Sequence, residues 1–408
     1  MTRVLVTDAG RGSGMAIVRS LGSRGVDVIA ADASRLSPAF ASRHVSERVV
    51  YPHPAAHPHE AVERLLIAAR EHSVDLVIPV GEELVILLSA ARGRFGDGVR
   101  LALPEAASFA KTHDKLATVE LARSLGIPTP HSKLVTSAAE ALAASDAFSW
   151  PIVLKPQASR ALRAEEAVES FGVAYAADVA ALERRMRAFE GRCAVILQEY
   201  QRGEGHGIGL LMDRGRPLLA FQHRRLREVP FTGGPSSYRE SVALDPALFD
   251  FSVRILRELD WTGPAMVEFK VRGDEASLME INGRLWGSLA VAVKSGVDFP
   301  GEIVELFLSS APEPLGAPQT GYDVGVRSKD FSLEIAWIAS VLIGKARYAF
   351  LDVPRRREAL AVAARLFDPR DGFDILTLRD PLPGLLEIVA LGLSAPGRLA
   401  RGRPRRGS

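Results

Sequence analysis

The segment LMEINGRLWG (278–287) carries a glutamate, an asparagine and an arginine at alternating positions. Because side chains on a strand alternate between its two faces, Glu280 and Asn282 would present oxygen ligands on one side. Arg284 follows at the same spacing. An ordinary solvated strand face would carry Thr, Lys or Ser at such positions. The segment therefore predicts a site for a charged ligand.

A hairpin would bring a second glutamate opposite the first. MVEFKV (266–271) reads as a strand that returns after a short turn. If Val271 pairs with Ser277, the register places Glu268 opposite Glu280, and facing carboxylates repel each other. A cation between them removes the repulsion, and oxygen ligands suit a hard ion such as magnesium bound with nucleotide phosphates. The alternative is a solvated hairpin with a coincidental acidic pair.

The composition is that of a globular protein. The chain has 408 residues, 47% of them hydrophobic and 25% charged, which allows roughly two or three domains. A net charge of +2 neither favours nor excludes an acidic partner, and we expect no nucleic-acid partner. The single cysteine, Cys193, excludes an intramolecular disulfide framework and reads as a buried residue rather than a nucleophile. The nine histidines show no zinc-ligand spacing.

The sequence shows no targeting or membrane-spanning segment. MTRVLVTDAG enters a strand directly, without the apolar core of a signal peptide. The apolar stretch 335–344 is shorter than the roughly 18 residues that a spanning helix needs. We therefore expect a cytoplasmic protein. The basic tail 397–408 is expected to be disordered, and a solvated tail is favoured over a weak phosphate or membrane-surface contact.

Strand-like and helix-like segments alternate over the first 104 residues, which predicts a Rossmann-like parallel sheet. Gly10, Gly12 and Asp32 match part of a dinucleotide-binding fingerprint. Met15 stands where the third glycine is expected, so this signal is weak. An NAD(P)-dependent oxidoreductase is an alternative function, but it leaves the acidic hairpin without a role.

The middle of the chain contains a charged residue at the end of an apolar strand. WPIVLKP (150–156) delivers Lys155 either to an exposed margin of the sheet or to an anion. The preceding segment 108–130 predicts a helix that Thr112 or Asp114 caps and that glycine and proline end.

The order of these segments resembles the ATP-grasp superfamily, which includes carbamoyl-phosphate synthase large subunit, biotin carboxylase and the D-alanine–D-alanine ligases. The Rossmann-like unit is followed by DK and GIPTP, then VLKP, LQEYQRGEG, and VEF with MEINGR. The resemblance covers roughly residues 1–310 and is nearest to the carboxylate–amine ligase type.

The resemblance implies an α/β fold in three parts. These are a Rossmann-like domain (1–104), a two-lobed α+β ATP-grasp domain (105–310, with a small lobe at about 128–198 and a large lobe at about 199–310), and a mainly helical extension with a disordered basic tail (311–408).

The resemblance also implies ATP and Mg²⁺ as cofactors, with Mn²⁺ as a substitute. The implied site residues are Lys115 and Lys155 for phosphate, Arg284 with Lys155 for catalysis, Glu268, Glu280 and Asn282 for magnesium, and Gln198, Glu199, Tyr200, Gln201 and Glu204 for the nucleoside. Glu204 lies one residue ahead of the usual ribose-binding position, which Gly205 occupies here. The segment 157–174 has one glycine where many members have a glycine-rich lid, so either Ser159 and Arg160 replace part of the lid or it closes differently.

A basic stretch, FQHRRLREVPFTGGPSSYRES (221–241), lies between the adenine segment and the acidic hairpin. Arginines bind carboxylates or phosphates in bidentate fashion, and small residues let backbone amides approach an anion. The expected substrate-binding residues are His223, Arg224, Arg225, Ser236, Ser237 and Arg239. The alternative is an exposed basic hairpin with a mobile loop.

The leading hypothesis is an ATP-dependent carboxylate–amine ligase. It would phosphorylate a small-molecule carboxylate to an acyl-phosphate and form an amide with an amine, releasing ADP and phosphate. A homodimer is one expected assembly. The alternatives are a bicarbonate-activating enzyme, the oxidoreductase above, and a non-catalytic nucleotide sensor.

Overall fold

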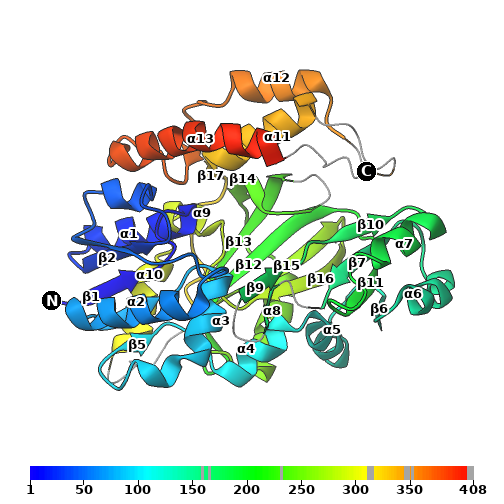
Figure 1. Cartoon of the computed structure of the whole chain (residues 1–408), viewed down its shortest axis with the longest axis horizontal. Coiled ribbons are helices and arrows are strands. Elements are labelled where there is room, and N and C mark those ends of the chain that lie inside the picture. The colour runs from blue at the N-terminus through cyan, green and yellow to red at the C-terminus, as the bar shows by residue number, and fades with distance from the viewer. Residues whose placement is uncertain are drawn as a thin grey trace.

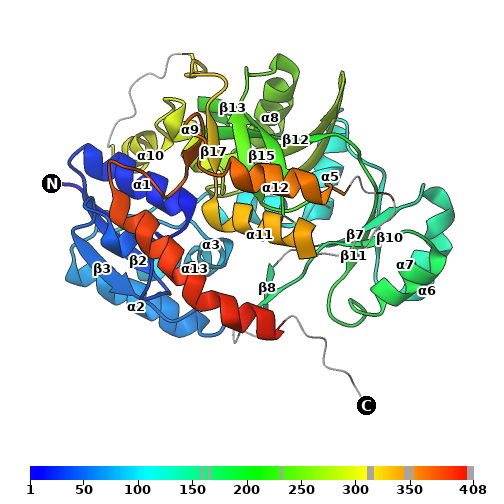
Figure 2. The ribbon, with the colours of Figure 1, turned by 90° about the horizontal axis from the view of Figure 1, so that it is seen from above.

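A computed structural model of the chain describes residues 1–157, 160–163, 167–229, 233–309, 317–343, 350 and 353–401. Figure 1 shows an N-terminal unit at one end, a small lobe at the other, and a large twisted sheet between them. The helices of the C-terminal region form a layer over the N-terminal unit and the large sheet (Figures 1 and 2).

The N-terminal unit is a parallel sheet with strand order β3-β2-β1-β4-β5. Its strands are short apolar runs, and helices cover both faces, so alternate side chains enter two separate cores. The elements are β1 (Arg3–Val6), α1 (Gly12–Ser23), β2 (Asp27–Asp32), η1 (Pro38–Ala41), β3 (Glu47–Val50), α2 (Pro58–Glu71), β4 (Leu76–Ile78), α3 (Glu82–Ala90), η2 (Arg92–Arg94) and β5 (Arg100–Leu101).

Two helices lead into the small lobe, whose main sheet has strand order β10-β7-β11-β6. The elements are α4 (Ala106–His113), α5 (Lys115–Ser124), β6 (Ser132–Val135), α6 (Ala138–Ala144), η3 (Ser145–Ala147), β7 (Ile152–Pro156), β8 (Arg160–Arg163), β9 (Ala167–Ser170), β10 (Ala174–Ala176), α7 (Val179–Met186) and β11 (Val195–Glu199). Strands β8 and β9 pair only with each other among the described residues. The lobe has its own apolar core, which α6 and α7 share with the sheet.

The large sheet has strand order β16-β15-β12-β13-β14-β17-β18. The elements are β12 (Glu204–Asp213), β13 (Arg216–Glu228), β14 (Ser236–Ser241), α8 (Pro246–Glu258), β15 (Gly263–Arg272), β16 (Glu275–Asn282), α9 (Leu289–Lys294), α10 (Phe299–Leu308), β17 (Arg327–Lys329) and β18 (Gly372–Phe373). Strands β17 and β18 come from the C-terminal region, which the sequence had predicted as mainly helical. This region therefore also extends the large sheet.

The β15–β16 hairpin has a different register from the predicted one beside its turn. Val271 lies opposite Ala276, not opposite Ser277, so the predicted pairing is wrong there. A bulge farther along adds one residue to β16. Beyond the bulge, Glu268 lies opposite Glu280, as the sequence predicted.

The bulge reconciles two demands on β16. Leu278 and Ile281 are both buried in the core, although strict alternation would place them on opposite faces. Met279, Glu280 and Asn282 line a cleft on the other side. The extra residue thus lets both apolar side chains face the core while both polar ones face the cleft.

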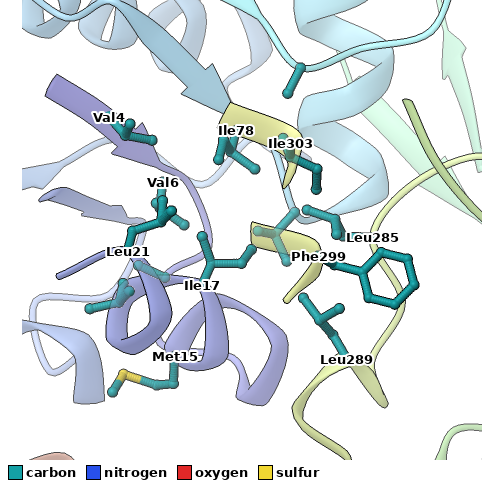
Figure 3. Packing of buried hydrophobic residues seen from close by; sticks show 14 of the residues in the cluster. Val4, Val6, Met15, Ile17, Leu21, Ile78, Leu285, Leu289, Phe299 and Ile303 are labelled. Atoms are coloured by element: carbon teal, nitrogen blue, oxygen red, sulfur yellow. The ribbon is translucent and has the colours of Figure 1, made fainter. Parts of the chain in front are cut away.

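The chain after this hairpin packs into the N-terminal unit. Ile17 of α1 and Ile78 of β4 share one buried cluster with Leu285 and Phe299 (Figure 3). Arg284 directly precedes Leu285, so this shared core fixes the backbone from which the arginine projects.

Trp286 explains one glycine of β12. The indole is fully buried and lies so close to Gly209 that a Cβ there would overlap it. Trp286 also packs edge-on against Phe299, with ring centroids 5.0 Å apart. The tryptophan after Arg284 therefore anchors the strand end to the large sheet.

Charged side chains hold the C-terminal region against the rest of the molecule. Its helices are α11 (Phe331–Ile343), α12 (Arg356–Ala364) and α13 (Pro381–Arg401). Arg19 of α1 donates from Nε to Asp380 Oδ2 at 3.0 Å and from Nη1 to the Asp374 carbonyl at 3.2 Å. Arg239 of β14 forms an ion pair with Asp374, and both side chains are almost fully buried. Among the described residues, no helix has the length and apolarity needed to cross a membrane.

Candidate active site

A cleft of about 1060 Å³ lies where the parts of the molecule meet. Arg11 lines it from the N-terminal unit, Lys155 from the small lobe and Glu280 from the large sheet. Glu387 of α13 lines it from the C-terminal region. The cleft brings together the six side chains that the sequence assigned to phosphate, metal and catalysis, namely Lys115, Lys155, Glu268, Glu280, Asn282 and Arg284.

Glu268, Glu280 and Asn282 form a compact set of oxygen ligands. The Asn282 amide Nδ2 donates to Glu268 Oε1 at 2.9 Å and approaches Glu280 Oε1 at 3.5 Å. Arg225 of β13 forms an ion pair with Glu268 from the other side. The described residues contain no metal-type cluster of three or more His, Cys, Asp and Glu, because the third member here is an amide.

The two carboxylates have different proton affinities. Burial raises the pKa of Glu268, and Glu280 adds to the rise, although Arg225 opposes it. Burial also acts to raise the pKa of Glu280, but Lys115 and Lys155 bring it below its ordinary value. Two facing carboxylates and an amide, all of them half-buried, fit a hard divalent cation.

Asp114 and Gln157 hold the two lysines near each other. Asp114 caps α5, because Oδ1 accepts from the backbone amides of the second and third helical residues, and Lys115 is the first. Gln157, two residues after Lys155, donates from Nε2 to Asp114 Oδ2 at 2.8 Å. The Lys115 amide donates to the Gln157 carbonyl at 3.0 Å. The sequence offered Asp114 only as a helix cap and did not indicate Gln157.

Lys155 lines the cleft from β7 of the small lobe, and Arg284 lines it from the segment after β16 of the large sheet. Burial lowers the pKa of Lys155, and Lys115 adds to the fall, although Glu280 opposes it. Arg284 Nη1 donates to the Leu285 carbonyl at 3.0 Å, and its Nη2 lies 3.9 Å from Glu82 Oε2. A cluster of cations beside carboxylates is suited to polyphosphate bound with a metal ion.

The predicted adenine segment lies partly at a second cavity of about 780 Å³. Glu199, Tyr200 and Gln201 line this cavity together with Trp150. Gln198 does not line it, because its side chain is buried in the small lobe, where Nε2 donates to Ser132 Oγ at 3.1 Å. The structure therefore assigns Gln198 to the lobe interior.

Glu204 does not reach either cavity. Its side chain is exposed, and Oε2 lies 3.5 Å from Arg224 Nη1. Gly205 lines the cleft instead, and a Cβ there would lie 2.8 Å from Glu228 Oε1. The prediction that Glu204 contacts the ribose is therefore not supported. Glu228 is the carboxylate that lines the cleft beside Gly205. The sequence analysis did not predict Glu228 as a site residue, because it belongs to the next strand, β13.

The predicted substrate-binding stretch divides between two faces of the sheet. Arg225, Ser236 and Arg239 line the cleft. Arg224 points to the other face, where Nη2 donates to Glu240 Oε2 at 2.8 Å.

His223 and Ser237 are fully buried. The His223 Nε2 lies 2.9 Å from Ser288 Oγ, and burial holds the pKa of this histidine well below its usual range. Because neither side chain lines the cleft, and Arg224 lies on the other face, we remove these three residues from the expected substrate site.

Several side chains that line the cleft were not expected from the sequence. Arg11 comes from the glycine turn after β1, Asp330 precedes α11, and Glu387 lies on α13. Glu387 is 7% exposed and accepts from Ser332 Oγ at 3.1 Å. No local motif marks Asp330 and Glu387, since only the docking of the C-terminal region brings them to the cleft.

The glycine turn is not arranged for a dinucleotide. Asp32 Oδ2 accepts from the Gly10 amide at 3.0 Å and from Ser37 Oγ at 2.9 Å, so protein groups already use it. Asp374 lies against the start of α1, where a Cβ on Gly12 would be 2.9 Å from its Oδ2. A carboxylate at that helix end occupies the region that a pyrophosphate needs.

The structure describes the predicted lid segment (157–174) except for residues 158–159 and 164–166. Ser159 is outside the described residues. Of Arg160 the structure describes the backbone, which begins β8.

Comparisons with known proteins agree with this geometry. Residues 192–329 match a family described as ATP-grasp in the biosynthetic pathway with Ter operon. The chain is 24% identical over 230 residues to the carbamoyl phosphate synthase large chain of Myxococcus xanthus, a match over 54% of this chain and 20% of that protein. It is 28% identical over 195 residues to phosphoribosylamine–glycine ligase of Phenylobacterium zucineum, over 46% of this chain and 45% of that protein. The matches thus span less than half the length of these curated relatives.

Solved structures share the fold. Biotin carboxylase of Campylobacter jejuni superposes with a TM-score of 0.62 at 15% identity, covering 80% of this chain and 74% of that one. L-amino acid ligase from Bacillus licheniformis superposes with a TM-score of 0.61 at 16% identity, covering 79% and 78%. The family match over residues 192–329, the relatives and the common fold confirm the resemblance to the ATP-grasp superfamily that the sequence predicted.

Proposed function

We propose that this chain is an ATP-dependent ligase that joins a small-molecule carboxylate to a small-molecule amine, with ADP and phosphate as products. The observation that carries the proposal is the convergence of two lysines, two glutamates, an asparagine and an arginine on one cleft. The names of phosphoribosylamine–glycine ligase and L-amino acid ligase support C–N bond formation among proteins of this kind.

The cleft residues have separate roles in the proposed phosphoryl transfer. Lys115 and Lys155 hold the nucleotide phosphates from the small-lobe side. Glu268, Glu280 and Asn282 would hold magnesium, which supplies charge neutralisation for the phosphates when it is bound. Such a site needs positioning and electrostatic stabilisation rather than a protein nucleophile.

The substrate carboxylate would meet arginines of the large sheet. Its oxygen attacks the γ-phosphorus, and the bond to ADP breaks, which leaves an acyl-phosphate on the substrate. Arg284 lies beside the metal ligands, where its planar guanidinium can neutralise the transferred group. An amine nitrogen then attacks the acyl carbon, the bond to phosphate oxygen breaks, and the nitrogen loses a proton.

The test begins with a screen for phosphate release over pools of carboxylic acids and amines. The active acid is then labelled with oxygen-18 in its carboxylate. We expect one labelled oxygen in the released phosphate per turnover and ADP as the nucleotide product. AMP with pyrophosphate, or label retained wholly in the product, would refute the acyl-phosphate route. Phosphate release with bicarbonate as the sole acid would favour the bicarbonate-activating alternative.

Cys193 provides the matched control for a covalent enzyme intermediate. It is half-buried, packs against the small-lobe core and does not line the cleft. Cys193→Ser should therefore keep full activity. A large loss of turnover in that variant would point to covalent catalysis through the thiol.

A further inference from the structure

Helix α13 forms one wall of the cleft. Glu387, Ala390 and Leu391 line the cleft, and their spacing of three and four positions places them on one side of the helix. Leu393 lines the cleft as well. Figures 1 and 2 show α13 extending from the N-terminal unit in the direction of the small lobe. The helix therefore borders the space in which the substrates of the proposed reaction would lie.

This wall is mainly apolar, and part of it is exposed inside the cleft. Leu333 of α11 lines the cleft together with Ala390, Leu391 and Leu393, and Leu36 lines it from the N-terminal unit. The exposed fractions of Leu393 and Leu36 are 67% and 46%. Large apolar side chains that stay exposed inside a cleft favour a ligand with an apolar group, because such a ligand removes them from water.

Two carboxyl groups belong to the same wall. Asp330 and the buried Glu387 both line the cleft. Asp330 Oδ1 accepts from the Leu333 amide at 2.9 Å, and Glu387 Oε1 accepts from Ser332 Oγ at 3.1 Å. Among the described residues, neither carboxyl lies within 4 Å of a lysine, arginine or histidine nitrogen. A cation carried by the ligand would supply the counter-charge that these two groups lack.

We propose that this wall forms the amine subsite of the cleft, and that the amine substrate carries a bulky apolar side chain. The inference rests on the proposed ligase function and adds the chemical class of one substrate. The apolar side chain would lie against Ala390, Leu391 and Leu393, and the ammonium group would face Asp330 and Glu387. The acid substrate fits this wall less well, because the two carboxyl groups would repel its carboxylate.

The first test measures binding by isothermal titration calorimetry at about pH 7 without ATP. Leucinamide is an amine with a branched apolar side chain, glycinamide lacks that side chain, and 4-methylpentanoate keeps the apolar group but has a carboxylate and no amine. We expect leucinamide to bind about 10- to 100-fold more tightly than glycinamide, since burial of a leucine side chain contributes a factor of this size. Equal binding of the two amides, no binding of leucinamide, or tighter binding of 4-methylpentanoate would overturn the proposal.

Variants with matched controls test whether leucinamide binds at α13. Ala390→Phe fills the space beside the wall and should weaken leucinamide binding by at least about tenfold. Val389→Phe places the same ring on the next residue, which is 54% exposed and does not line the cleft, so it should bind like the wild type.

A charge variant tests the acidic part of the wall. Glu387→Gln keeps the shape of the side chain but removes its charge, and it should weaken leucinamide binding about 10- to 100-fold. Glu358→Gln, on the exposed surface of α12, should have no effect. Unchanged leucinamide affinity in both Ala390→Phe and Glu387→Gln would place the binding site elsewhere and refute the inference.

The ligase reaction gives an independent measurement. In the screen for phosphate release, amines with bulky apolar side chains should give a higher kcat/KM than small amines. Turnover that apolar side chains do not improve would leave the ligase function standing and refute this inference. Leucinamide binding that depends on Ala390 and Glu387, without phosphate release for any pair of acid and amine, would support the subsite and refute the ligase function.

Discussion

Removing the charge of Asp374 should strongly destabilise the fold. It forms an ion pair with Arg239, and the two side chains are 1% and 2% exposed. Its Oδ1 also accepts from Ser328 Oγ at 2.6 Å. Asp374→Asn keeps the shape and the serine hydrogen bond but removes the ion-pair partner of the buried arginine.

Removing one partner of a buried ion pair costs about 3–5 kcal/mol, because the remaining charge loses its compensation without regaining water. We expect Asp374→Asn to lower the free energy of unfolding by this amount. Asp374→Ala should lower the free energy of unfolding by about 1 kcal/mol more, since it also removes the hydrogen-bond acceptor for Ser328 Oγ. Urea unfolding followed by circular dichroism measures both changes.

Two controls make the result specific. The surface pair between Arg254 Nε and Asp250 Oδ2, at 2.8 Å, should contribute at most about 1 kcal/mol, so Asp250→Asn should be nearly silent. Arg239→Met combined with Asp374→Leu removes both charges and should recover most of the stability. If Asp374→Asn lowered the free energy of unfolding as little as Asp250→Asn does, the Arg239–Asp374 ion pair would not be buried in solution, and this prediction would be wrong.

Three further predictions concern the cleft. Burial and the neighbouring Asp330 raise the pKa of Glu387 from 4.5 to about 7, so its stabilising contribution is complete below about pH 4.5 and is lost as the pH rises through about 7. Glu387→Gln should therefore raise the melting temperature at about pH 8 but not at about pH 5, and equal shifts at both would contradict the assignment. Glu280→Ala or Asn282→Ala should lower magnesium-dependent ATP turnover by about 10²–10³-fold with little change in melting temperature, whereas near-normal turnover would show that the metal site lies elsewhere. Lys155→Met should weaken ATP binding about 10- to 100-fold in calorimetry, because a charge-assisted hydrogen bond is lost, and unchanged affinity would place this lysine at the sheet margin instead.

The acidic hairpin shows how far strand alternation carries a prediction. Alternation and an assumed turn placed Glu268 opposite Glu280, and the structure has that pairing. The assumed pairing of Val271 was nevertheless wrong by one residue, and the bulge compensates for the difference. A bulge has no fixed sequence signature, so its position could be inferred only from the burial of Leu278 and Ile281 three residues apart.

The basic stretch shows where alternation was not applied. Arg224 and Arg225 are neighbours on β13, so their side chains must leave the sheet on opposite faces. The sequence reading grouped them as one site, and only Arg225 lines the cleft. A stricter use of the period of two assigns the two arginines to opposite faces from the sequence alone.

The contribution of the C-terminal region could not be read from the sequence. Arg239 and Asp374 are separated by 135 positions, and neither belongs to a recognisable motif. Contacts between distant segments depend on how helices dock, and the local periodicity of α11 and α13 says only that each has an apolar side. In the sequence Glu387 is for this reason an unremarkable helical residue, and only the packing of α13 places it in the cleft.

The bulge in β16 also determines where the chain tolerates a change in length. Met279 is the extra residue, so its removal would leave Leu278 facing the core and Glu280 facing the cleft in an uninterrupted alternation. Removing instead a single residue between Glu275 and Leu278 would shift the pairing with β15 near the hairpin turn by one residue. Side chains in that part of β16 would then point to the opposite face of the sheet. The strand that carries the proposed cation ligands Glu280 and Asn282 therefore contains one position at which evolution or design can shorten it without moving these two side chains.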